Sequence, residues 1–146
     1  MAGNITFTII KPYAMKKGKA GSIIAMIMNS GFKIVAMKLT HLTLEDAEKF
    51  YMVHKGKPFY DSLVKFMSSG PIIVAILEME NAVKEYRKII GNTDPGKAEE
   101  GTIRKLYGES IQANAVHGSD NDENAAYESN FFFSFRERFY TRKELI

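Results

Sequence analysis

The stretch Asn114–Asp120, NAVHGSD, places His117 between an apolar dipeptide and a run of small polar residues. Imidazole titrates near neutral pH, and its free base can attack an electrophile. Gly118 has no side chain, so a substrate could approach the ring closely, and Ser119 adds a hydroxyl. Such a histidine needs its other ring nitrogen held, and Glu128 in the following segment could reach back to hold it. The pattern allows a nucleophile, but taken alone it is more simply a histidine that starts a helix at a turn.

Three cations and two aromatic residues could bind the substrate of such a histidine. Lys11 ends an apolar segment, Arg87 lies in an amphipathic one, and Arg104 lies in the later stretch GTIRK. Arginine can bind phosphate through two parallel N–H groups, whereas lysine acts as a point charge. Tyr51 and Phe59 flank the basic turn HKGKP and could stack on a nucleobase. Taken alone, each cation also fits a solvated surface charge, and each aromatic residue also fits the core.

Two other features look chemical but have simpler explanations. The segment Gly91–Lys97, GNTDPGK, satisfies the P-loop pattern G-x-x-x-x-G-K, but Ala98 stands where a Ser or Thr would hold magnesium. Pro95 removes a backbone N–H from this loop, and the loop follows a predicted helix rather than a strand. His41 and His54 lie in polar stretches, so we predict that both are solvated surface residues.

Composition excludes several classes of protein. The chain has 146 residues, enough to bury a core, and we expect residues 1–146 to form a single domain. There is no cysteine, which excludes disulfides, thiolate zinc sites and cysteine nucleophiles. The net charge of +3 favours anionic ligands but is too small to indicate nucleic acid by itself. We see neither a secretory signal nor an apolar run long enough to span a membrane, and we expect a cytoplasmic protein.

Hydrophobic periodicity predicts the elements that must position these residues. Strands are expected at 5–10, 32–39, 71–79 and 131–135, a basic loop at 11–19 and a charged surface tail at 136–146. Helices are expected at 20–31, 44–54, 59–70, 81–91, 102–108 and 119–129. Thr43 and Asp46 should cap the second of these helices, and Ser119 and Asp120 the last.

Without the connecting helices, the order is strand, helix, strand, strand, helix, strand. This is the order of the ferredoxin-like split βαβ fold. We therefore expect an α/β protein, an α+β sandwich, in which a four-stranded antiparallel sheet carries helices on its faces and extra helices in its connections.

Five motifs together resemble those of the nucleoside diphosphate kinase family: NAVHGSD, KPFY, SGP, GNTDP and EEGTIR. The resemblance extends from ITFTIIKP near the N-terminus to FFFSF near the C-terminus. It implies a ferredoxin-like sandwich that transfers the γ-phosphate of a nucleoside triphosphate to a nucleoside diphosphate. The phosphate would wait on His117 as phosphohistidine, which gives ping-pong kinetics with broad tolerance of base and sugar.

The resemblance also implies roles for individual residues. Glu128 would orient the ring of His117, Ser119 would assist Glu128, Lys11 would lie against the transferred phosphate, and Tyr51 would shape the same pocket. The remaining expected nucleotide contacts are Arg87, Thr93 and Arg104 with the outer phosphates, Asn114 with the sugar, and Phe59 and Ile111 with the two faces of the base. Mg²⁺ would arrive on the nucleotide phosphates without a direct protein ligand. Asp120 would cap a helix and could reach the ion through water.

The chain departs from the family pattern at Tyr13, where the usual Lys-Pro-Asp becomes Lys11-Pro12-Tyr13. This leaves Lys11 and His117 in place, so we expect activity to persist. Ser22 stands where the family often has Glu. The resemblance further implies a homo-oligomer, a tetramer or a hexamer, with no membrane and no requirement for nucleic acid. The alternative is a non-catalytic nucleotide- or RNA-binding ferredoxin-like module that stacks bases on sheet aromatics such as FFFSF, or a catalytically silent scaffold.

Overall fold

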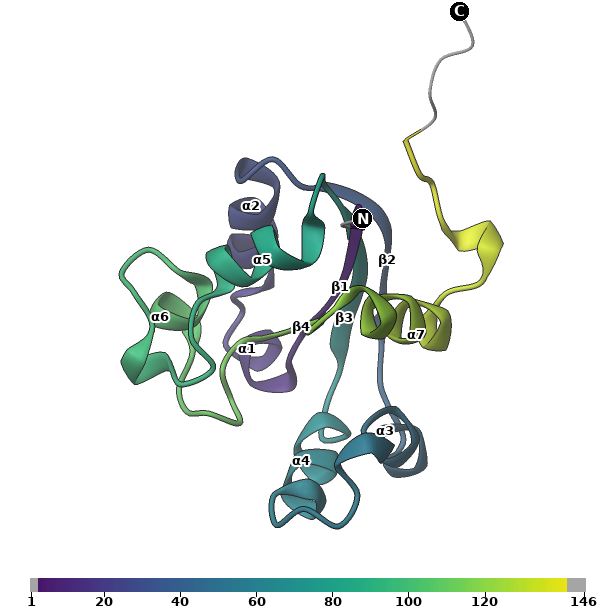
Figure 1. Ribbon diagram of the computed structural model, residues 1–146. Helices are drawn as coiled ribbons and strands as arrows, with labels where there is room; N and C mark the ends of the chain where they lie inside the picture. Colours follow the sequence, from purple (N-terminus) through teal and green to yellow (C-terminus); the bar gives the residue numbers. More distant parts are fainter. Residues whose placement is uncertain (1–2, 142–146) are drawn as a thin grey trace, which may run out of the picture.

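An antiparallel sheet of four strands, in the order β2-β3-β1-β4, runs through the middle of the molecule (Figure 1). The computed structural model describes residues 3–141. The strands are β1 (Ile5–Ile10), β2 (Lys33–Thr40), β3 (Ile72–Glu78) and β4 (Val116–Gly118). β1 pairs with β3 and β4, and β2 pairs with β3, always antiparallel. The predicted ferredoxin-like fold class is thereby confirmed.

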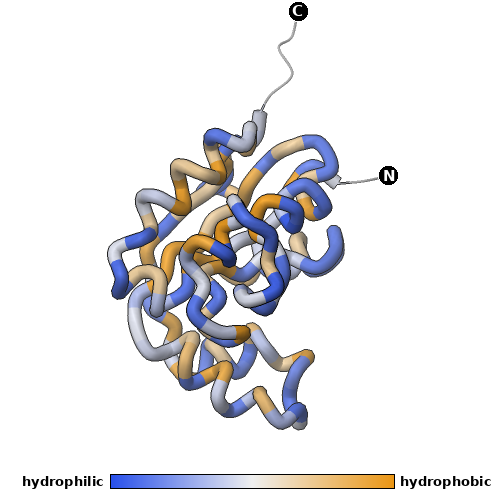
Figure 2. Tube along the Cα trace, turned by 90° about the vertical axis from the view of Figure 1, so that its left-hand side faces the viewer, coloured by the Kyte–Doolittle hydropathy of each residue, from blue (hydrophilic) through white to orange (hydrophobic). Residues whose placement is uncertain are grey.

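Helices cover both faces of this sheet. They are α1 (Pro12–Lys16), α2 (Ala20–Asn29), α3 (Leu44–Phe50), α4 (Tyr60–Met67), α5 (Ala82–Ile90), α6 (Ile103–Tyr107) and α7 (Asp122–Phe132). Side chains alternate along β1: Phe7 and Ile9 enter a core shared with α3 and α4, and Ile10 enters a core shared with α2 and α5. Hydrophobic residues accordingly gather toward the middle of the chain trace (Figure 2). Among the described residues, no helix has both the length and the hydropathy needed to cross a bilayer.

Local capping explains where several helices begin and end. Thr43 Oγ1 accepts from the N–H of Asp46, and the Asp46 carboxylate accepts from the N–H of Thr43, which confirms the predicted cap of α3. Helix α5 ends at Gly91, whose φ of +88° favours glycine. The P-loop-like segment is thus a helix end followed by a 3₁₀ turn at Pro95–Lys97, so its rejection as a P-loop is confirmed.

Three predictions about the elements are wrong. The aromatic run 131–135 is not a strand: Phe131 and Phe132 form the end of α7, and the fourth strand is Val116–Gly118. That strand has only three residues, too few for a periodic pattern, and it exists because β1 pairs with it. Helix α7 is capped by Asn121, whose side chain accepts from the N–H of Asn124, and not by Ser119 or Asp120.

The third error concerns residues 11–19, predicted as a loop. Pro12 begins the short helix α1, since its fixed φ suits the first turn of a helix.

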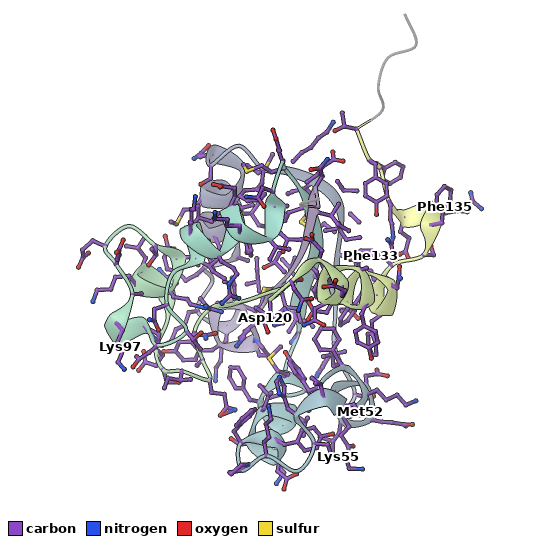
Figure 3. The ribbon with its side chains drawn as sticks, in the orientation of Figure 1. Met52, Lys55, Lys97, Asp120, Phe133 and Phe135 are labelled. Atoms are coloured by element: carbon purple, nitrogen blue, oxygen red, sulfur yellow. The ribbon has the colours of Figure 1, made fainter. Side chains whose placement is uncertain are left out.

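At the other end of the chain, Phe133 is buried whereas Phe135 is 86% exposed and projects from the edge of the molecule (Figure 3). The predicted surface tail continues beyond residue 141, and that part lies outside the described residues.

Candidate active site

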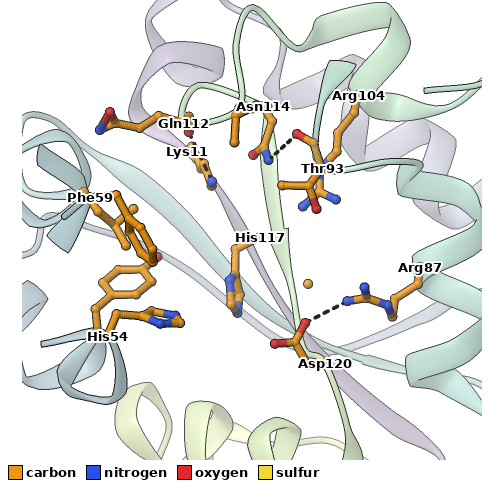
Figure 4. A pocket seen from close by; sticks show the side chains of 14 residues that line it. Lys11, His54, Phe59, Arg87, Thr93, Arg104, Gln112, Asn114, His117 and Asp120 are labelled. Carbon is orange, nitrogen blue, oxygen red and sulfur yellow. Dashed lines mark hydrogen bonds and ion pairs between the residues drawn. The ribbon is translucent and has the colours of Figure 1, made fainter. Parts of the chain in front are cut away.

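A cavity of about 330 Å³ lies where β1 and β4 meet the ends of several loops and helices (Figure 4). It brings together the predicted site residues Lys11, Tyr51, Phe59, Arg87, Thr93, Arg104, Ile111, Asn114, His117 and Asp120. Segments from residue 11 to residue 120 therefore converge at one place. Ser119 and Glu128 do not line this cavity, and they lie behind His117 instead.

His117 sits in the middle of β4, opposite Ile9 of β1. Its Nε2 atom is buried and lies 3.0 Å from Oε1 of Glu128, a close contact short of an aligned hydrogen bond. The same Glu128 oxygen accepts from Ser119 Oγ at 2.7 Å, and Ser119 is hydrogen-bonded to the backbone of Phe7. With Nε2 directed at Glu128, Nδ1 is the ring nitrogen left to react.

Aromatic rings confine the imidazole of His117. Phe50 and Phe7 present their rings to it with centroids 5.8 Å and 6.1 Å away, and Tyr51 lies at 6.5 Å. The Tyr51 hydroxyl is buried, and burial, followed by the nearby Glu128 carboxylate, raises the pKa of this phenol. Tyr51 therefore stays neutral and narrows the pocket, so the imidazole has little freedom to turn away from the cavity.

Gly118 is needed for packing beneath the site. A Cβ atom added to Gly118 would lie 2.9 Å from Cδ1 of Ile90 and 3.2 Å from Cδ2 of Tyr86, both on α5. The Tyr86 hydroxyl in turn lies 2.6 Å from Oγ1 of Thr8, which donates to the main-chain oxygen of His117. Gly118 lines the cavity through its backbone, but the space its missing side chain leaves is filled by α5 rather than reserved for substrate.

Lys11 is only 7% exposed, and its ammonium group donates to the main-chain oxygen of Gln112 at 3.2 Å. Burial and the nearby Arg104 guanidinium lower the pKa of Lys11 to about 7. The positive charge of Lys11 is thus held at an energetic disadvantage. An anionic ligand in the cavity would relieve this disadvantage, because an opposite charge favours the protonated form.

Arg104 links two loops while it borders the cavity. Its two terminal nitrogens donate to the main-chain oxygens of Gly91 and Val116, each at 3.0 Å. Burial is the main cause that lowers the pKa of Arg104, to about 10, so the guanidinium stays charged at neutral pH. Each terminal nitrogen carries a second N–H group, so Arg104 can hold the loops and still donate to a ligand.

Arg87 and Asp120 form an ion pair at the rim of the cavity, with Nη1 and Oδ1 2.8 Å apart (Figure 4). Both side chains are exposed, so the pair is weak and can exchange partners. Asp120 thus forms an ion pair and does not cap helix α7 as predicted. An incoming phosphate would compete with Asp120 for the Arg87 guanidinium.

Two exposed apolar side chains, Phe59 and Ile111, line part of the cavity, and we call the space between them the slot. Phe59, which precedes α4, and Ile111, in the loop before β4, are 48% and 61% exposed. Asn114, which also lines the cavity, is buried and donates through Nδ2 to the main-chain oxygen of Thr93 at 3.0 Å. The Oδ1 atom of Asn114 is buried without a protein hydrogen-bond partner among the described residues, so its acceptor capacity is unused.

Some pocket residues escaped sequence analysis. His54, predicted as a solvated surface residue, lines the cavity with its ring 5.4 Å from that of Phe59, and partial burial and Lys57 lower its pKa. Gln112 lines the cavity as well. The confining Phe7 and Phe50 were also missed. A signal existed only for Phe7, which alternates with threonines in a strand directly before Lys11.

The fold and the cavity define a class of protein: a ferredoxin-like α+β sandwich whose cavity places cationic side chains around a histidine. The nucleoside diphosphate kinase family matches the chain over residues 4–138. A nucleoside diphosphate kinase of Flavobacterium psychrophilum is 60% identical over 139 residues, which is 95% of this chain and 100% of that protein. One of Chlorobaculum tepidum is 57% identical over 132 residues, 90% of this chain and 94% of that protein. The chain belongs to the nucleoside diphosphate kinase family.

Solved structures agree with this assignment. The nucleoside diphosphate kinase of Aquifex aeolicus superposes with a TM-score of 0.90 at 44% identity, covering 92% of this chain and 98% of that chain. A halophilic nucleoside diphosphate kinase from Halobacterium salinarum in complex with CDP gives a TM-score of 0.90 at 32% identity, covering 97% of this chain and 95% of that one.

Proposed function

We propose that this protein transfers the γ-phosphate of a nucleoside triphosphate to a nucleoside diphosphate through a phosphohistidine on His117. The observation that carries the proposal is the arrangement of its imidazole. Nε2 is buried against Glu128, which is itself held by Ser119, and the ring stands in a cavity lined by Lys11 and Arg104. A nucleophile with an oriented ring and cations beside it is what phosphoryl transfer requires, because this chemistry depends on positioning and charge neutralisation.

In the first half-reaction, the lone pair of His117 Nδ1 attacks the γ-phosphorus. The P–N bond forms as the bond from that phosphorus to the β,γ-bridging oxygen breaks, and the diphosphate leaves with the electron pair. Glu128 stabilises the positive charge on the ring through Nε2–H. In the second half-reaction, a terminal oxygen of another diphosphate attacks the same phosphorus and the P–N bond breaks. Lys11 and Arg104 neutralise the phosphoryl oxygens in both directions.

Mg²⁺ fits this cavity as an ion carried by the nucleotide. Among the residues that line the cavity, Asp120 supplies a carboxylate at the rim, and the rest of the polar lining is neutral or cationic. Magnesium typically binds through one or two carboxylates together with substrate phosphates, and it retains several waters. When bound, it would supply further charge neutralisation to the phosphates. Asp120 would hold it through water once Arg87 turns to the phosphates.

The slot between Phe59 and Ile111 supports binding of any nucleobase. Both walls contact a base by its faces, which all bases share. In the proposed complex, the unpartnered Oδ1 of Asn114 would accept from a sugar hydroxyl, and Thr93 and Arg87, which line the cavity, would contact the outer phosphates. We therefore expect broad tolerance of base and sugar. The RNA-binding alternative loses its main support, because Phe131 and Phe132 lie in α7 rather than on a strand.

We also infer a homo-oligomer, a tetramer or a hexamer. Strand β2 lies at an edge of the sheet, and Met37 and Leu39 on it are 49% and 66% exposed. An edge strand with exposed apolar side chains favours association. Light scattering after size exclusion would distinguish a monomer from either oligomer.

We expect residues 1–146 to act as one domain that does not require nucleic acid. Because its proposed substrates are metabolites of the cell interior, we expect the protein to act in the cytoplasm.

The test is to label the protein with γ-³²P-ATP and Mg²⁺ and then to add GDP. We expect an acid-labile, alkali-stable label on His117 that leaves as GTP forms, and no label on the His117→Ala variant. A folded protein that binds nucleotide but takes no label would refute the proposed function and favour a non-catalytic binding module.

A further inference from the structure

Gln112 touches both sides of the candidate active site. Its side-chain Oε1 accepts from Ser62 Oγ at 2.9 Å, and its Nε2 donates to the main-chain oxygen of Ser62, also at 2.9 Å. Its own main-chain oxygen accepts from the ammonium group of Lys11 at 3.2 Å. In Figure 4, Gln112 lies above Phe59, and a dashed line joins it to Lys11. Gln112 thus contacts both helix α4 and the ammonium group of Lys11.

Gln112 and its partner Ser62 each lie next to one wall of the slot. Ser62 lies in α4, less than one helical turn after Phe59, and Gln112 directly follows Ile111. Within residues 3–141, the two bonds between Ser62 and Gln112 are the only hydrogen bonds that join segment 44–67 to segment 108–114. The separation of the two walls is therefore fixed chiefly at this point.

We propose that Gln112 is a positioning residue that couples the base slot to the phosphate end of the cavity. Its side chain sets the separation of Phe59 and Ile111, and its main-chain oxygen sets the position of the Lys11 ammonium group. This inference rests on the proposed function, because it assigns the slot to the nucleobase and Lys11 to the transferred phosphate. A base that spreads the slot also shifts Lys11, and a loose slot leaves Lys11 misplaced.

The chemistry of the amide suits this role. A glutamine side chain offers one acceptor and one donor, which match the hydroxyl and the carbonyl of Ser62. A glutamate would still accept from the hydroxyl, but it would face the Ser62 carbonyl with a second acceptor. Because the amide is committed to Ser62, it is not free to read the polar edge of a base. The pair can therefore tighten the slot without making it selective among bases.

The sharpest test compares variants at Ser62 that differ only in a hydroxyl. Thr and Val have nearly the same shape, so Ser62→Thr retains the donor to Gln112 and Ser62→Val removes it. We expect Ser62→Val to bind nucleoside diphosphates about 3-fold more weakly than Ser62→Thr, as one exposed hydrogen bond allows. Ser69→Ala, two residues after the end of α4 and outside the cavity, is the control and should bind as wild type does.

Gln112→Ala tests the coupling to Lys11. It should raise the nucleotide Kd about 3- to 10-fold by removing both bonds to Ser62. It should also lower kcat, and it should move the alkaline limb of the kcat/KM profile to lower pH, because the shifted carbonyl no longer stabilises the Lys11 ammonium group. A merely structural residue would lower Tm without moving this limb. Gln112→Glu should fall between Gln112→Ala and wild type in nucleotide Kd.

A double-mutant cycle decides whether the two residues act together. If they form one connection, Ser62→Val adds little to the Kd of Gln112→Ala. Effects that multiply independently, or an unshifted alkaline limb in Gln112→Ala, would overturn the inference. An inactive wild-type protein would refute the proposed function instead, and the nucleotide Kd values of these variants would still decide the connection between the two walls.

Discussion

Lys11 should take up a proton when a nucleotide binds. In the free protein its pKa is about 7, so at pH 8 only about a tenth of the molecules carry the charge. A phosphate oxygen near the ammonium group is worth about 4 kcal/mol at an effective dielectric constant of 20, which raises the pKa by about three units. Binding of ADP with Mg²⁺ at pH 8 should therefore be accompanied by uptake of about 0.9 proton.

The proton uptake that accompanies nucleotide binding should decrease as the pH falls below 8. At pH 6 Lys11 is already charged in about nine molecules of ten, so its uptake should fall to about 0.1 proton. The measurement is isothermal titration calorimetry in buffers of different ionisation enthalpy, because the apparent binding enthalpy changes in proportion to the protons exchanged. Nucleotide affinity should weaken as the pH rises above 7, because protonation of Lys11 then costs part of the binding free energy.

Lys11→Arg is the matched variant, since arginine keeps the charge but does not titrate in this range. Its proton uptake at pH 8 should be close to zero. His54, whose pKa lies below its ordinary value, is unchanged by this substitution and cannot produce the difference. Equal uptake by wild type and Lys11→Arg would refute the assignment of a neutral Lys11 to the free protein at pH 8.

Three further substitutions test other parts of the site. Glu128→Gln should slow labelling of His117 about 10²- to 10⁴-fold in rapid-quench experiments, because Nε2 loses its charged partner; an unchanged rate would remove Glu128 from the mechanism. Gly118→Ala should lower the free energy of unfolding in urea by about 1–3 kcal/mol, because its Cβ would lie 2.9 Å from Cδ1 of Ile90. Adding Ile90→Val, which deletes that atom, should recover part of the loss, and no recovery would contradict the packing argument. Tyr13→Phe removes an exposed hydrogen bond to Glu109 and should change stability by less than about 1 kcal/mol without altering kcat; a tenfold loss of kcat would place Tyr13 in the site.

Much of the fold could be predicted because long elements carry strong periodic patterns. The alternation of β1 and the apolar run of β3 indicate strands, and Thr43 with Asp46 marks the start of α3. β4 could not be found in this way, because three residues cannot establish a period and pairing with β1 determines the strand. The run 131–135 was wrongly predicted to be a strand, because consecutive phenylalanines fit a buried strand and the end of a helix equally well.

Some features of the candidate site could likewise be predicted from the sequence, and others could not. Motifs around Lys11 and His117 identified the residues that converge on the cavity, because the chemistry is tied to residue types in a fixed local order. The connection between Ser62 and Gln112 has no such signature, since its partners are 50 residues apart and both are ordinary polar residues. The ion pair of Arg87 with Asp120 escaped for the same reason, as only the folded chain brings α5 and the end of β4 together.

The position of α7 in the chain has a consequence for biosynthesis. This helix supplies Glu128, and Phe132 at its end stacks on Phe7, whose ring borders His117. It is the final helix before a short 3₁₀ turn in the described part of the chain. During translation, β1 and the cavity cations Lys11, Arg87 and Arg104 therefore leave the ribosome before Glu128 does. Under the proposed mechanism, a nascent chain would phosphorylate His117 only slowly until α7 has emerged and docked.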